Sequence, residues 1–345
     1  MAPAAGDICC SIQTWTFHEL DATLNPDMIK LTDYCKTWCL QPSIIKTVSS
    51  LFHLHHASTI HELNVYLNGQ KVKHEVEPVY LGVTLDRTLS YHAHLKKTAA
   101  KVKTRNDLLS KLAGSSWGAR APTLRMSALA TSYSVAEYYT RVWSQSSHTK
   151  LVDMQLHAAM HIISGTLCPT PLPWLPVLSN IAPSHIRQEV ATGKLLEKVH
   201  ANSSLPLHND LFKPPAARLP SRRPLWSHPP RQDARVETLW REEWISVIIP
   251  NQSLITDSTI CPLGFDLPHC QWSLLNRFWT GKGLCAANQY RWGLCDSPLC
   301  SCGATQTMTH IVDECPLTTF SRGLEELHHA IENAITWLDN YAHAK

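Results

Sequence analysis

The sequence predicts an α+β protein, with a helix and antiparallel hairpins first, followed by a mostly helical remainder that ends in a small module containing cysteine and histidine. Three observations support this fold class. Apolar residues recur every three or four positions over residues 17–40, which is the helical period. Polar and apolar residues alternate on both sides of Asn68-Gly69, which is the pattern of a β-hairpin. From about residue 91 onward, helical spacing dominates up to a cysteine and histidine cluster that begins at Cys300.

Residues 1–90 are expected to form the first domain and to contain the sheet elements. Its predicted elements are, in order, a helix over 17–40 that Pro42 ends, a short strand over 49–54, a hairpin over 62–76 and a strand over 80–86. Within the last strand, Gly82 has no side chain and can permit a close approach of another backbone.

Residues 91–200 and 236–345 are predicted to be two mostly helical regions, joined by a Pro/Arg-rich linker over residues 201–235. The linker has no sustained periodicity, so we interpret it as a solvated tether, with nucleic-acid contact as the alternative. The prolines between Pro169 and Pro176 predict an extended passage. Helices are predicted over 122–143, 151–163, 186–199, 236–249 and 271–279, and an apolar stripe over 324–338 predicts a closing helix that covers the cysteine module.

One stretch of the chain is strongly basic, although the net charge of the whole protein is only +3. Between Arg87 and Arg125, nine lysine and arginine residues accompany a single acid, Asp107. Clustered cations of this kind are typical of phosphate contacts, and the alternative is a helix face that is merely solvated. The residues predicted to contact nucleic acid here are Lys96, Lys97, Lys101, Lys103 and Arg105, of which Lys97, Lys101 and Arg105 share one helical face.

The start of the chain lacks a basic signal-peptide region, and no apolar run approaches the roughly 18 residues of a membrane span. The sequence therefore predicts an intracellular protein of the nucleus or cytoplasm, with no signal peptide or transmembrane segment. The twelve cysteines of such a chain are expected to be reduced or bound to metal rather than paired in disulfides.

The strongest chemical signal is a zinc-knuckle-like ligand set formed by Cys300, Cys302, His310 and Cys315. Structural Zn²⁺ takes four thiolate or imidazole ligands in a closed tetrahedron, and these four residues lie within sixteen positions. Gly303 follows the second cysteine, where a turn around a metal needs a positive φ. Two alternatives are open: the four residues are unrelated, or Cys295 takes the place of Cys300, because the Cys-x-Cys spacing is tighter than usual.

Several separated stretches carry a resemblance that covers essentially the whole chain. They are Pro42 to Thr47 with Phe52-His53-Leu54, then Tyr80 to Arg87, Trp117 to Arg125, Gln271 to Gly283, and Gln306 to Asp313. Together they resemble the C-terminal half of the reverse transcriptase of a Jockey-type non-LTR retrotransposon. The resemblance implies a partial palm with a primer-gripping hairpin over 1–90, in which Tyr80 and Gly82 contact nucleic acid. It further implies a thumb over 91–200 and a C-terminal Cys-Cys-His-Cys module over 236–345.

The resemblance also implies where the catalytic metals of a complete polymerase would lie. Such enzymes hold two Mg²⁺ ions on aspartates, a pair of which follows an aromatic residue and alanine. The matching place here reads Ala4-Ala5-Gly6-Asp7, so Asp7 is the one matching catalytic residue. A lone carboxylate leaves two Mg²⁺ ions short of ligands. We therefore expect structural Zn²⁺ as the cofactor, and Mg²⁺ only where a polymerase site is complete.

Two functions follow as hypotheses, and both have RNA and DNA as partners, namely the element transcript and a primer-template. In the first, the chain is a truncated RNA-directed DNA polymerase fragment that keeps its nucleic-acid-binding thumb and zinc module but is inactive by itself. In the second, it is a non-catalytic RNA-binding zinc protein. A decayed element fragment without a cellular role is a third interpretation.

Overall fold

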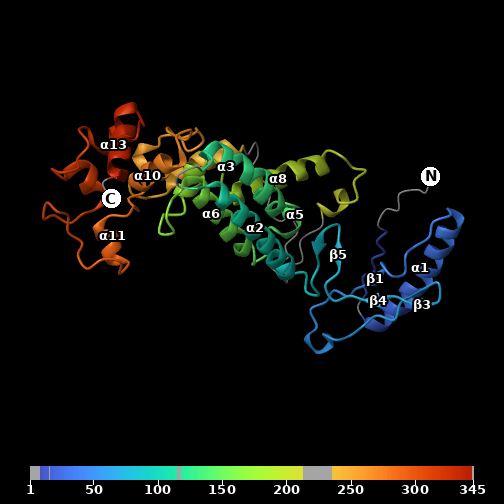
Figure 1. The fold of residues 1–345 in the computed structure, drawn as a ribbon. Helices are drawn as coiled ribbons and strands as arrows, with labels where there is room; N and C mark the ends of the chain where they lie inside the picture. Colours follow the sequence, from blue (N-terminus) through green and yellow to red (C-terminus); the bar gives the residue numbers. More distant parts are fainter. Residues whose placement is uncertain (1–7, 15, 115–117, 213–234, 344–345) are drawn as a thin grey trace. The chain divides into compact units, whose positions relative to one another are not determined.

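The computed structural model describes residues 8–14, 16–114, 118–212 and 235–343. The chain divides into two compact units, residues 1–94 and 95–345 (Figure 1). Asp7, Trp117 and most of the predicted linker lie outside the described residues. Among the described residues, no helix combines the length and the apolar character that crossing a membrane requires.

The first unit combines one long helix with three two-stranded sheets, which agrees with the predicted mixture of helix and small sheets. Its elements are α1 (Phe17–Thr37), β1 (Val48–Ser49), the 3₁₀ turn η1 (His56–Ser58), β2 (Tyr66–Leu67), β3 (Gln70–Lys71), β4 (Lys73–His74), β5 (Val79–Tyr80) and β6 (Val83–Thr84). Pairing is antiparallel between β2 and β3 and between β5 and β6, whereas β1 pairs with β4 in parallel, which the predicted hairpins did not include.

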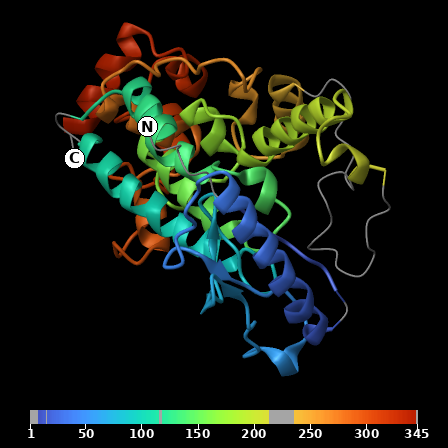
Figure 2. The same cartoon turned by 90° about the vertical axis from the view of Figure 1, so that its right-hand side faces the viewer.

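Helix α1 is the scaffold of the first unit, and it lies beside the small strands (Figure 2). Its buried face, with Leu20 and Met28, packs against Leu63, Val65, Leu67 and Val72 of the β2–β3 region. Two side chains of α1 also bind the incoming strand: the N–H of Asn64 donates to Asp21 Oδ1 at 3.1 Å, and the N–H of Tyr66 donates to Asn25 Oδ1 at 3.0 Å. These bonds satisfy backbone groups that a two-residue strand leaves unpaired.

Both hairpins turn through two residues with positive φ. Asn68 and Gly69 have φ of 51° and 75°, so the predicted turn is confirmed, although the paired strands are shorter than predicted. The single strand predicted over 80–86 is wrong, because Leu81 and Gly82 have φ of 47° and 83° and reverse the chain between β5 and β6. Turns of this type match the twist of the paired strands, which explains the glycine at the second position.

The second unit is helical. It contains most of α2 (His92–Leu112), which begins at the end of the first unit, and the elements α3 (Ala121–Ala128), the π-helical turn η2 (Leu129–Tyr133), α4 (Ser134–Ala136), α5 (Thr140–Trp143), α6 (Lys150–Ser164), α7 (Trp174–Ser179), α8 (Ser184–His200), η3 (His208–Asp210), α9 (Val236–Ser246), η6 (Gln252–Leu254), α10 (His269–Trp279), α11 (Ala286–Arg291), the π-helical turn η7 (His310–Glu314), α12 (Gly323–Leu327) and α13 (Glu332–His343).

The structure corrects three predictions in this unit. The helix predicted over 122–143 is broken, because Tyr139 adopts φ of 50°; the break lets Trp143 be buried with its Nε1 donating to Tyr138 O at 3.1 Å. The proline-rich passage is not all extended, since α7 contains Pro176 within its first turn, where a missing N–H costs no helical bond. The closing helix is split into α12 and α13 at Ala330, which has φ of 50°.

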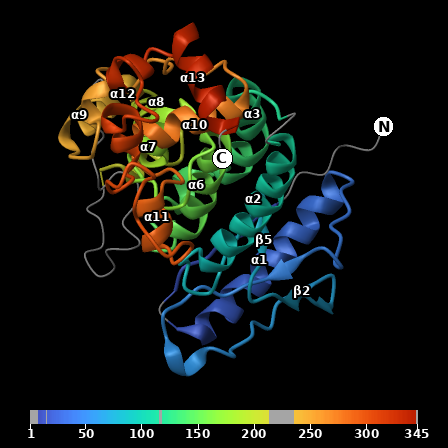
Figure 3. The ribbon, with the colours of Figure 1, turned by 60° about the vertical axis from the view of Figure 1, so that its left-hand side comes forward.

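Helix α10 docks onto the C-terminal end of α6, where helix carbonyls lack intrahelical partners. His269 Nε2 lies 2.9 Å from Ile162 O, Asn276 Nδ2 donates to Ser164 O at 2.8 Å, and Arg277 Nε donates to Gly165 O at 3.1 Å. On its other side α10 contacts α13 (Figure 3). These polar contacts give α10, the helix that precedes the cysteine module, a defined place on the rest of the unit.

The Thr280-Gly281 pair ends α10. Gly281 has φ of 63°, its N–H donates to Phe278 O, and the N–H of Lys282 donates to Arg277 O. This pair of bonds is the Schellman pattern that closes a helix. Gly281 therefore serves to end the helix.

Candidate metal centre

The first two candidate ligands, Cys300 and Cys302, lie on a tight turn. Leu299 and Thr305 form an antiparallel bridge, and inside it the N–H of Cys300 donates to Ala304 O at 2.7 Å while that of Gly303 donates to Cys300 O at 2.8 Å. Gly303 has φ of 92°, and this confirms the prediction of a glycine turn after the second cysteine.

The other two candidate ligands bracket the π-helical turn η7. The N–H of His310 donates to Thr307 Oγ1 at 3.0 Å, which begins the turn, and the N–H of Cys315 donates to His310 O at 2.7 Å, which closes it. A bond across five residues is the mark of a π turn, and such turns are frequent at functional sites. It brings the residues at the two ends of η7 close together.

The four side chains form one group, whose ligand atoms all lie within 4.8 Å of one another. Cys300 Sγ is 3.7 Å from Cys315 Sγ, and Cys302 Sγ is 3.2 Å from His310 Nε2. A tetrahedral Zn²⁺ with bonds of about 2.3 Å to sulfur and 2.0 Å to nitrogen needs sulfur–sulfur edges of about 3.8 Å and sulfur–nitrogen edges of about 3.5 Å. The group therefore has nearly the spacing that a metal ion needs.

Hydrogen bonds favour the thiolate form of two of the three cysteines in this group. The backbone N–H of Cys302 is the main cause that lowers the pKa of Cys300 to about 6, and Gln306 Nε2 also donates to its sulfur at 3.5 Å. The pKa of Cys315 is lowered, chiefly by the hydroxyl of Thr318. The backbone N–H of Ala304 acts to lower the pKa of Cys302, but burial and the neighbouring cysteines raise it overall. Thiolates, not thiols, ligate metals, so Cys300 and Cys315 are the sulfurs prepared for binding at neutral pH.

The imidazole of His310 has a second partner. Its Nε2 faces the sulfurs, while Nδ1 lies 3.4 Å from Glu314 Oε2. A carboxylate on the far nitrogen holds a metal-ligating histidine in one tautomer and orientation. We did not select Glu314 from the sequence; its position four residues after His310 was the signal that could have identified it.

The alternative ligand Cys295 is outside the group. Its Sγ lies 3.4 Å from Ala286 O and 3.2 Å from Ser297 O, so its thiol bonds to the backbone of a neighbouring turn. The structure therefore assigns Cys300 to the group and excludes the substitution of Cys295 for it.

The predicted nucleic-acid-binding residues lie on two different elements. The five predicted cations all lie on α2 and are exposed, outside the buried face of the helix, which contains Leu95, Thr98, Val102, Asn106 and Leu109. The buried amide of Asn106 joins α2 to α6, because its Nδ2 donates to Gln155 O at 2.7 Å. Tyr80 and Gly82 lie on the β5–β6 hairpin of the first unit, where Tyr80 is exposed. The described part of the chain thus brings the four metal ligands together, whereas the predicted nucleic-acid contacts are spread over both units.

These features define a protein of mixed helix and small sheets that contains a Cys₃His group able to hold a metal ion. A comparison with models of known families, with curated proteins and with solved structures finds no significant match to this chain.

Proposed function

We propose that the chain is the C-terminal part of a non-LTR retrotransposon reverse transcriptase, and that by itself it binds RNA or primer-template DNA with a helical region stabilised by zinc. The observation that carries this proposal is the Cys₃His group in a chain whose separated motifs resemble that family. A soft set of three thiolates and one imidazole suits Zn²⁺ and not Mg²⁺. The group uses all four tetrahedral positions, which is typical of a structural ion.

The structure shows a role for one of the stretches that carry the resemblance. The stretch from Gln271 to Gly283 contains Asn276 and Arg277, which bind the last carbonyls of α6, and Gly281, which ends α10. Asn276 and Arg277 cap α6, and Gly281 closes α10. A family of proteins with this arrangement of helices would need these residue types at this spacing. On this proposal, the motif positions α10 ahead of the zinc module.

RNA binding through α2 is tested by replacing Lys97, Lys101 and Arg105 together with alanine, which keeps the helix because alanine is the strongest helix former. The slope of log K against log salt is negative, and each lost phosphate contact with a single strand reduces its magnitude by about 0.7. The three substitutions are therefore expected to reduce the magnitude of the slope by about 2 in total. Fluorescence anisotropy with labelled single-stranded RNA at several salt concentrations measures it.

The matched control for this variant removes three exposed cations elsewhere in the second unit, Lys150, Lys198 and Arg291. The control is expected to keep the salt slope of the original chain. If the α2 variant also keeps it, the face of α2 is only a solvated surface and the contact lies elsewhere.

Primer extension distinguishes the binding protein from the polymerase. We expect the purified chain to make no template-directed DNA with Mg²⁺ or Mn²⁺, because Asp7 is the one residue that matches the aspartates that hold two catalytic ions. The assay uses an annealed primer-template with labelled nucleotides, and an active reverse transcriptase as the positive control. Extension that follows the template would contradict the proposal and favour the polymerase hypothesis.

A further inference from the structure

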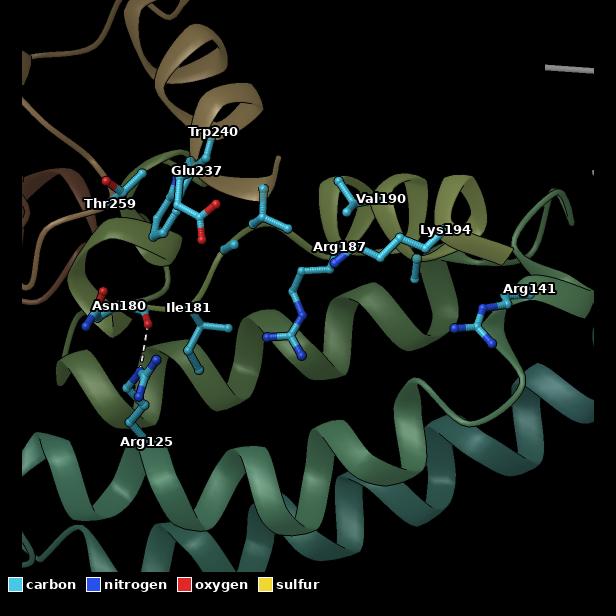
Figure 4. A pocket seen from close by; sticks show the side chains of 13 residues that line it. Arg125, Arg141, Asn180, Ile181, Arg187, Val190, Lys194, Glu237, Trp240 and Thr259 are labelled. Carbon is cyan, nitrogen blue, oxygen red and sulfur yellow. Dashed lines mark hydrogen bonds between the residues drawn. The ribbon is translucent and has the colours of Figure 1, made fainter. Parts of the chain in front are cut away.

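A pocket of about 470 Å³ lies among α3, α5, α8 and α9, apart from the metal ligands and the basic face of α2 (Figure 4). Among the described residues that line it, four side chains are cationic and one is acidic. The cations are Arg125 of α3, Arg141 of α5, and Arg187 and Lys194 of α8, and the acid is Glu237 of α9. Arg187 forms an ion pair with Glu137 at 2.7 Å, so the excess of positive charge in the lining comes chiefly from Arg125, Arg141 and Lys194.

Two of the arginines are held in place by protein contacts. Arg125 Nε donates to Asn180 O at 2.7 Å, and Arg187 Nη2 donates to a Glu137 carboxylate oxygen at 2.7 Å. The guanidinium carbon of Arg187 also lies 5.3 Å from the centre of the Tyr133 ring. A guanidinium has five N–H donors, and each of these hydrogen bonds uses one of them. Both groups are therefore oriented in advance and retain donors for a ligand, which lowers the entropic cost of binding.

The order of the cations favours an extended anion. In Figure 4, Arg125, Arg187 and Arg141 follow one another along the pocket, with Ile181 between the first two. Arg125 and Arg187 are partly buried, whereas Arg141 and Lys194 are exposed. A small anion enclosed in a pocket is usually met by converging donors. A row that runs from partly buried to exposed guanidinium groups instead suits a chain of phosphates that continues into solvent.

We propose that this pocket binds the phosphodiester backbone of a single nucleic-acid strand, with the four cations in contact with successive phosphates. A guanidinium fork matches the oxygens of a phosphate in a bidentate manner. Apolar side chains at Ile181 and Val190 provide a wall for sugars and bases. The volume lies within the range of sites that enclose a small ligand, so it admits a segment of a single strand and not a duplex. The proposal rests on the proposed nucleic-acid binding and adds a contact separate from α2.

The first test is the double variant Arg141→Gln/Lys194→Gln, because both side chains are exposed and the fold does not depend on them. Two lost contacts should reduce the magnitude of the salt slope for single-stranded RNA by about 1.4 and weaken binding roughly tenfold at moderate salt. The control is Lys150→Gln/Arg291→Gln, which removes the same charge from exposed positions that do not line the pocket and lie on other helices. The control should bind like the original chain.

The second test is a substitution that is expected to strengthen RNA binding instead of weakening it. Glu237→Gln removes the acid found among the described lining residues and should tighten RNA binding several-fold, an outcome that damage to the fold cannot produce. Glu242→Gln, an exposed position on the same helix that does not line the pocket, should leave the affinity unchanged. Equal effects of the two glutamate variants, or of the two cation pairs, would overturn the pocket as a specific contact.

Competition experiments identify the ligand class. An unlabelled RNA strand should displace the labelled one, while a mononucleotide or poly-glutamate at equal anion concentration should displace much less. Displacement by the mononucleotide as effective as by RNA would make the pocket a small nucleotide site, and displacement by poly-glutamate would make it a surface for acidic protein; either result overturns the proposal.

If the α2 variant loses RNA affinity and the Arg141/Lys194 variant does not, the proposed function stands and the pocket proposal falls. If the original chain binds no RNA, both fall.

Discussion

Replacing Cys302 with serine is expected to reduce zinc from about one ion per chain to a small fraction and to unfold the module around η7. The reason is that Cys302 is one of four ligands within 4.8 Å of one another, and three ligands do not close the tetrahedron. Structural zinc binds folded small modules with apparent free energies of about 10–16 kcal/mol at neutral pH, so most of the order of a module this small depends on the ion. Elemental analysis of the purified chain measures zinc, and the loss of near-UV signal measures the unfolding.

Cys295→Ser is the matched control, because this thiol is nearby in the sequence but outside the group. It should retain zinc and stability. Full zinc in Cys302→Ser together with loss of zinc in Cys295→Ser would show that the ligand set is wrong.

The same site predicts a dependence on pH. The pKa of Cys300 is held at about 6, below its usual value, so the thiolate is present above this pH and is lost as the pH falls through it. Protons compete with zinc for the three sulfurs and for the imidazole of His310, so the affinity for zinc should fall as the pH is lowered, and the bound ion moves the loss of each thiolate below the pKa of the free thiol. Titration of the same sample with a competing chelator at a series of pH values, corrected for protonation of the chelator, measures this affinity. An affinity that does not change with pH would contradict the assigned thiolates.

Gly165→Ala is expected to destabilise the second unit strongly. Gly165 ends α6 with φ of 63°, and a Cβ there would lie 1.7 Å from Ser273 Oγ on α10. The left-handed conformation costs a residue with a side chain about 1–2 kcal/mol, and the overpacking adds about 1–3 kcal/mol as α10 is pushed away from the carbonyls that it caps. Urea unfolding followed by far-UV circular dichroism measures the difference.

Gly293→Ala separates these two causes. Gly293 has φ of 70°, but nothing lies within 4 Å of a Cβ built there, so it should lose only the backbone contribution. The double variant Gly165→Ala/Ser273→Gly should lose less unfolding free energy than the two single variants lose in total, since the second change removes the clashing side chain. Equal losses for Gly165→Ala and Gly293→Ala would show that the contact between α6 and α10 is not tight.

Features within one element were predicted well, because their signals are local. The helical period identified α1, α6, α8 and α10, and Asn68-Gly69 identified the turn between β2 and β3. Features that depend on an unusual backbone were missed. Tyr139 and Ala330 have positive φ and interrupt predicted helices, yet neither residue type favours that conformation as glycine or asparagine does. Only the packing around them, such as the burial of Trp143, makes these breaks favourable.

The sequence by itself identified Cys300, Cys302, His310 and Cys315 as candidate metal ligands, because all four lie within sixteen positions and the glycine turn between them is a local signal. It also determined the exposed basic face of α2, since spacing of four places side chains on one side of a helix. Only the tertiary structure decided that Cys295 is excluded and that α10 caps α6 from more than a hundred residues away. It alone also brought Arg125, Arg141, Arg187 and Lys194 to one pocket. Cations on three separate helices share no sequence period, so only packing of those helices can place them together.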